Sequence, residues 1–72
     1  MVSINDAQLA VLGEGLELRM ERIDLGDAFH EPAASQPLIR RIRDLDEQYG
    51  RLLCDTAEGE YLQALKKEYG VK

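Results

Sequence analysis

The chain has 72 residues with 9 basic and 14 acidic side chains, which gives a formal net charge of −5. With 44% apolar and 32% charged residues, the composition is typical of one small folded domain and unlike that of a disordered chain. No apolar run approaches the ~20 residues that span a bilayer, no signal-peptide pattern is present, and a single cysteine excludes an internal disulfide. We therefore expect a cytoplasmic protein that does not associate with membranes.

Residues 1–25 form the first predicted element, and a helix with two apolar sides is the favoured interpretation. One side consists of Leu9, Leu12, Leu16, Met20 and Ile23. The nearly opposite side consists of Ala7, Val11, Leu18 and Leu25. A helix that is apolar on two sides must be sandwiched between neighbours. We expect other helices of the chain to cover one side and something else to cover the other.

The same segment also fits a β-hairpin, which remains the alternative. Residues 16–21 alternate apolar and polar side chains with the period of a half-buried strand, and Gly13 and Gly15 suit a tight turn. The two glycines would cost a continuous helix about 2 kcal/mol. Against the hairpin, Leu, Glu, Arg and Met favour helices, and the segment has few β-branched or aromatic residues.

Residues 26–35 are predicted to be a connection, because Gly26 favours a helix stop and Pro32 prevents a continuous helix through residue 31. Residues 36–54 follow as a predicted helix that Ser35 would cap. Its apolar side, which we assign to the core, consists of Leu38, Ile42, Leu45, Tyr49 and Leu52. Gly50 is unfavourable in a helix interior and points to fraying near this end.

Residues 57–69 are predicted to be the last helix, with a cap at Asp55 or Thr56 and a left-handed stop at Gly70. Leu62 and Leu65 are its predicted core residues. The helices at 36–54 and 57–69 are close in sequence, so they predict a C-terminal αα-hairpin. The predicted fold is mainly α, with residues 1–72 in a single small domain.

Residues suited to catalysis or metal binding are scarce. His30 lies near Asp27 and Glu31 in the connection, but one histidine does not supply the three or four ligands of a metal site. Cys54 follows two leucines, and we expect it to be an inert, buried thiol. No spacing indicates a Ser/His/Asp or Cys/His arrangement. We therefore predict no enzyme activity, no cofactor, no metal and no small-molecule substrate.

The surplus of apolar residues in the first 25 positions predicts a surface that binds protein. We expect a non-enzymatic, acidic interaction module that serves as a regulator or accessory subunit of a larger protein. The partner would be that larger protein or a second copy of the chain. The predicted contact residues are Leu9, Glu14, Leu16, Glu17, Leu18, Met20 and Glu21.

The distribution of charge supports an alternative function. Residues 1–32 hold seven acids and two bases, so the whole net charge of −5 lies there, and direct binding of nucleic acid is disfavoured. An acidic protein of this size resembles, in size and charge only, the inhibitors that phages encode against polymerases or nucleases. Such a protein would occlude a basic surface of the enzyme, and its binding would weaken as salt rises.

Overall fold

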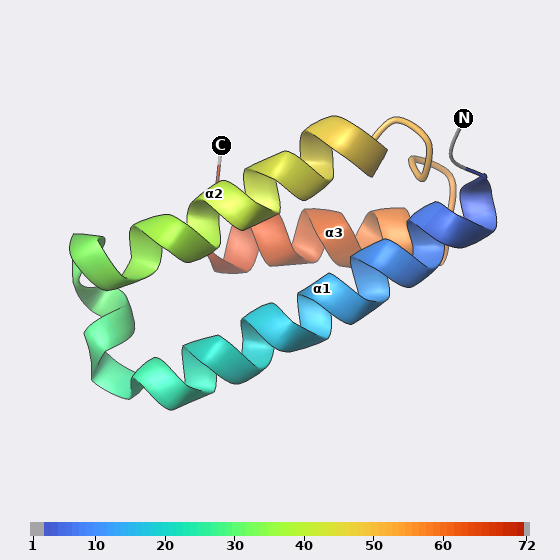
Figure 1. Cartoon of the computed structure of the whole chain (residues 1–72). Helices are drawn as coiled ribbons and strands as arrows, with labels where there is room; N and C mark the ends of the chain where they lie inside the picture. Colours follow the sequence, from blue (N-terminus) through green and yellow to red (C-terminus); the bar gives the residue numbers. More distant parts are fainter. Residues whose placement is uncertain (1–2, 72) are drawn as a thin grey trace.

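The computed structural model describes residues 3–71, and this part of the chain folds into helices joined by short connections. In chain order they are α1 (Ile4–Leu25), the 3-10 helix η1 (Gly26–His30), α2 (Pro32–Tyr49) and α3 (Ala57–Glu68). Figure 1 shows α1 and α2 running in opposite directions, with α3 behind them and running parallel to α1. The mainly α fold with its C-terminal helix pair is confirmed. No strand occurs in residues 3–71, so the β-hairpin interpretation is wrong.

The first helix continues through both of its glycines because packing outweighs their cost. Ser3 caps its N-terminus, where the hydroxyl accepts a hydrogen bond from the Asp6 N–H at 3.3 Å. Gly26 ends it with a φ of 55°, in the left-handed region that favours glycine. Its inner side packs against α2 and α3, and the buried hydrophobic side chains on that side are Ala7, Val11 and Leu18. Tertiary packing of this kind, rather than local propensity, supplies most of a helix's stability in a protein.

The second helix begins and ends earlier than the predicted 36–54. Pro32 occupies its first turn, where the missing N–H has no intrahelical partner to lose. Ser35 therefore lies inside the helix and is not the cap; its hydroxyl is 3.5 Å from the Pro32 carbonyl oxygen. At the other end Gly50 caps the helix, and its N–H donates to the Asp46 carbonyl oxygen at 2.8 Å.

The third helix has the cap and the stop that its sequence predicts. The Thr56 hydroxyl accepts a hydrogen bond from the Gly59 N–H at 3.1 Å, so Thr56 and not Asp55 is the cap. After Glu68 the chain turns at Gly70, whose φ is 73°. The Val71 N–H donates to the Lys66 carbonyl oxygen at 2.8 Å, and the Val71 side chain packs into the core.

All three α-helices contribute to the hydrophobic core. The predicted core residues that are buried are Leu38, Ile42, Leu45, Leu62 and Leu65, and Tyr49 is partly buried against them. Leu52 is 39% exposed, whereas the neighbouring Leu53 is fully buried. The assignment of Leu52 to the core is wrong because α2 ends at Tyr49, so its helical periodicity does not extend to residue 52. Cys54 follows in the same turn and is exposed, which corrects the expected buried thiol.

Candidate interaction surface

The outer side of α1 carries a line of exposed, large apolar side chains. The exposed fraction is 70% for Leu9, 61% for Leu16, 66% for Met20 and 78% for Ile23, while Leu12 is 39% exposed. We call these residues the outer stripe. Leu9, Leu16 and Ile23 recur every seven residues, so they lie almost in line along about 21 Å of helix.

The outer stripe is narrow. Leu12 and Met20 each lie four residues from Leu16, which places them about 40° to either side of it around the helix. The stripe therefore covers about 80° of the helix circumference, less than the ~100° of a side that faces a globular core. Gly13 lies beside it, and no atom lies within 4 Å of the place where its β-carbon would be. This width is that of a seam which accommodates one helix.

Leu18 belongs to the core and not to the contact surface that the sequence predicted. Its side chain is fully buried, and its carbonyl oxygen accepts a hydrogen bond from the Tyr69 hydroxyl at 3.0 Å. Burial also raises the pKa of the Tyr69 phenol. Small residues on this side allow α3 to approach closely, since a β-carbon on Gly15 would lie 2.6 Å from the Tyr61 ring. Ala7 is also fully buried on the inner side of α1.

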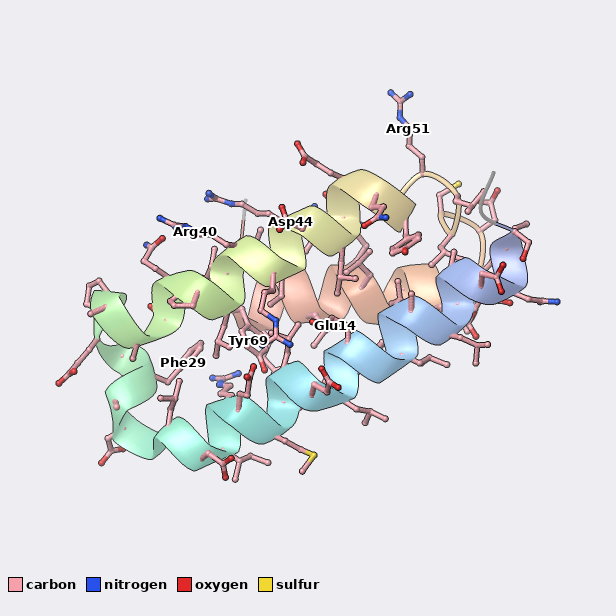
Figure 2. All side chains as sticks on the ribbon, viewed as in Figure 1. Glu14, Phe29, Arg40, Asp44, Arg51 and Tyr69 are labelled. Carbon is pink, nitrogen blue, oxygen red and sulfur yellow. The ribbon has the colours of Figure 1, made fainter. Side chains whose placement is uncertain are left out.

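The predicted acidic contact residues surround an arginine of α2. The Arg41 guanidinium lies 2.6 Å from a Glu14 carboxylate oxygen and 3.4 Å from one of Glu17, and it also pairs with Glu21. The hydrogen bond with Glu14 raises the pKa of Arg41. In Figure 2 Glu14 lies on the side of α1 that faces α2, whereas Arg40 and Arg51 project away from α1. The sequence analysis missed this cluster because helical spacing reveals neighbours on one helix only.

One edge of the outer stripe carries two arginines that are held by contacts within the molecule. Arg19 and Arg22 lie on the edge toward α3, and their guanidinium nitrogens are 3.3 and 2.9 Å from the Glu68 carboxylate oxygens. Arg19 also donates a hydrogen bond to the Tyr61 hydroxyl at 3.2 Å, and this bond raises the pKa of Arg19. Arg22 stacks over the Phe29 ring at 4.3 Å. These arginines therefore join α1 to α3.

The opposite edge of the outer stripe carries two exposed acids, and only one of them contacts a basic side chain within residues 3–71. Glu17 directly follows Leu16, and its side chain is 68% exposed despite the contact with Arg41. Asp24 directly follows Ile23, and within residues 3–71 it is exposed and has no ion pair. Glu17 and Asp24 are seven residues apart, so they lie in line along the same edge. We call these residues the acidic edge.

Two further features are a hollow beside α1 and the exposed His30. A hollow of about 300 Å3 lies between α1 and α2 and is open to solvent. Its lining residues are Ala10, Glu14, Arg41, Asp44, Leu45, Gln48 and Tyr49. His30 is exposed, and in the described part of the chain no group of three or more His, Cys, Asp or Glu residues is placed to hold a metal. None of the helices described is long and apolar enough to cross a membrane.

Comparisons with known proteins provide no family for this chain. No family model matches it, and neither the curated proteins nor the solved structures yield a match.

Proposed function

We propose that this protein acts without catalysis, as a regulator or accessory subunit that binds a larger protein through the outer stripe of α1. The supporting observation is the exposure of Leu9, Leu16, Met20 and Ile23, each between 61% and 78%, beside a core that forms without them. Removing such a set of apolar side chains from water would contribute on the order of 6 kcal/mol before the costs of association are subtracted. Exposed apolar side chains that lie side by side on a small protein mark a surface that binds a partner.

Apart from the buried Leu18, the predicted contact residues divide into three groups under this proposal. Leu9, Leu16 and Met20 lie on the outer stripe and carry the apolar contact. Glu17 lies at its edge, within reach of a partner side chain. Glu14 and Glu21 serve mainly to join α1 to α2 through Arg41.

A charge-neutral double variant, Leu16→Gln with Met20→Gln, tests the proposal. The tagged protein is purified from the cells that produce it, and co-purifying proteins are quantified by mass spectrometry. We expect the stoichiometric partner of the wild type to fall at least tenfold, because each substitution removes about 1.5 kcal/mol or more of apolar burial. Helix content by circular dichroism should stay unchanged, since both side chains are exposed.

The matched control is Leu52→Gln, which changes an exposed leucine outside α1. This variant should retain the partner at the level of the wild type. The assignment of the outer stripe would be refuted if the double variant recovered as much partner as the wild type. It would also be refuted if the control lost as much partner as the double variant.

The surplus of acids on α1 favours one second candidate, occlusion of a basic surface on a nucleic-acid-handling enzyme. Arg41 offsets only part of the charge of the three glutamates around it, so α1 stays acidic. In this function the acids would supply most of the binding, and the partner would be lost at high salt even with the outer stripe intact. Activity of a purified polymerase or nuclease, titrated with this protein at low and high salt, tests it.

A further inference from the structure

We infer that the occupant of the outer stripe is an amphipathic helix of the partner protein with basic residues along one of its edges. This inference rests on the proposed function and names the chemistry of the partner. It follows from the shape of the stripe, from the charge of its two edges, and from a comparison with a second copy and with a lipid surface.

The shape of the stripe indicates a helix. Its residues extend over about 21 Å but only about 80° of the circumference, with the seven-residue repeat of a coiled-coil seam. The open position at Gly13 lets a partner side chain pack directly against the α1 backbone. A partner helix of about 15 residues matches this length.

The charge of the edges indicates basic residues on the partner. Glu17 and Asp24 are exposed and lie in line on the acidic edge, and Asp24 has no ion pair among the residues described. Lysines or arginines seven residues apart on the partner helix would face both carboxylates. Such rim charges accelerate encounter and exclude acidic partners. The other edge offers no comparable site, because its arginines already contact Glu68, Tyr61 and Phe29.

A second copy of the chain fits this surface less well. In a two-fold dimer with antiparallel α1 helices, equivalent edges meet, so the acidic edge would face the acidic edge of the second copy. In a parallel dimer the acidic edge would face Arg19 and Arg22, whose charges are already shared with Glu68. Each copy also carries a net charge of −5. Neither arrangement therefore offers the acidic edge a basic side chain that is free of other contacts.

An anionic lipid surface also fits poorly. Helices that lie on such surfaces carry lysine and arginine beside their apolar side. The outer stripe has acids along one edge, and the arginines along the other are already paired with Glu68. The same acids that attract a basic helix would repel anionic headgroups.

The test uses two synthetic helical peptides of 21 residues with the same leucine seam. One carries lysines along one edge, and the other carries glutamates at the same positions. Binding of each labelled peptide to the full chain is measured by fluorescence anisotropy at 50 and 500 mM NaCl. We expect the lysine peptide to bind at least tenfold more tightly than the glutamate peptide at low salt, and its dissociation constant to rise several-fold at high salt.

Variants of the full chain separate the two proposals. Glu17→Gln with Asp24→Asn should remove most of the preference for the lysine peptide. The matched control, Asp44→Asn with Glu60→Gln, removes the same charge from exposed positions on α2 and α3. This control should keep the preference for the lysine peptide. Leu16→Gln with Met20→Gln should weaken the binding of both peptides.

Equal affinity for the two peptides, or binding of the lysine peptide that is insensitive to salt, would overturn the inference. If either result were found but the Leu16→Gln, Met20→Gln variant (the stripe variant) lost binding of the peptides, the proposed function would still be supported. Lysine-peptide binding that the stripe variant leaves unchanged would overturn both. A dimer of the wild type in sedimentation equilibrium, or binding to vesicles containing phosphatidylserine, would also overturn the inference, because another occupant would then cover the stripe.

Discussion

Replacing Gly13 with alanine should stabilise the protein. Gly13 lies in the interior of α1, is exposed, and has no atom within 4 Å of the position of a β-carbon. Alanine loses less backbone entropy than glycine when a helix forms, so the free energy of unfolding should rise by about 0.5–1 kcal/mol. In a domain of this size 1 kcal/mol corresponds to about 4–8 °C in Tm, so we expect an increase of about 2–8 °C.

The same change at Gly59 should have the opposite effect. A β-carbon there would lie 1.8 Å from the carbonyl oxygen of Leu53, which is backbone and not a mobile side chain. Relieving this clash requires α3 to move away from the turn that precedes it. That movement disturbs the Thr56 cap and the burial of Leu53, so we expect a loss of about 2–4 kcal/mol.

Urea denaturation followed by circular dichroism at 222 nm measures both variants against the wild type. Gly15→Ala is a useful third variant, because its β-carbon would meet the tip of the Tyr61 side chain at 2.6 Å. A side chain can move aside more easily than backbone, so this variant should lie between the other two. If Gly13→Ala were destabilising, α1 would not be an open, regular helix at this position. If Gly59→Ala were neutral, the close approach of α3 to Leu53 would be wrong.

Three further predictions concern the contacts between helices. Leu18→Asp should abolish the helical signal at 25 °C because a fully buried, unpaired charge costs several kcal/mol, whereas Leu16→Asp should stay folded. The raised pKa of the Tyr69 phenol means that the folded state holds its proton more tightly than the unfolded state does, so this contribution is present below pH 10 and lost above it. Urea midpoints should therefore fall more steeply above pH 10 in the wild type than in Tyr69→Phe. Arg41→Gln should lower stability by about 1 kcal/mol at low salt, and a difference from the wild type that persists at 1 M NaCl would argue against the ion-pair cluster.

Local signals in the sequence predicted the parts of the fold that depend on neighbouring residues. The cap at Thr56, the stop at Gly70 and the return of Val71 are contacts within a few positions of each other, so composition and spacing reveal them. The two-sided pattern of α1 is likewise a property of one helix. Spacing alone was sufficient to place Leu9 and Leu16 together on one side.

Features that depend on tertiary packing could not be predicted from the spacing of residues in the sequence. Spacing shows that α1 has two apolar sides but not which one turns inward, and the inner side carries smaller residues such as Ala7 and Val11. The structure buries Ala7, Val11 and Leu18 and exposes the side with Leu9 and Leu16. The contacts of Arg41 with α1 join positions 20 or more residues apart, which no helical period relates. The burial of Leu53 in place of the expected Leu52 depends on where α2 ends.

The two sides of α1 predict two kinds of mutant in a living cell. Substitutions on the inner side, such as those at Val11 or Leu18, raise the unfolded fraction, and proteases would then reduce the amount of protein present. Substitutions on the outer side, such as those at Leu9 or Ile23, leave a full complement of folded protein that lacks its activity. A mutational scan that records abundance and phenotype separately would show these classes alternating along α1 with the period of the helix.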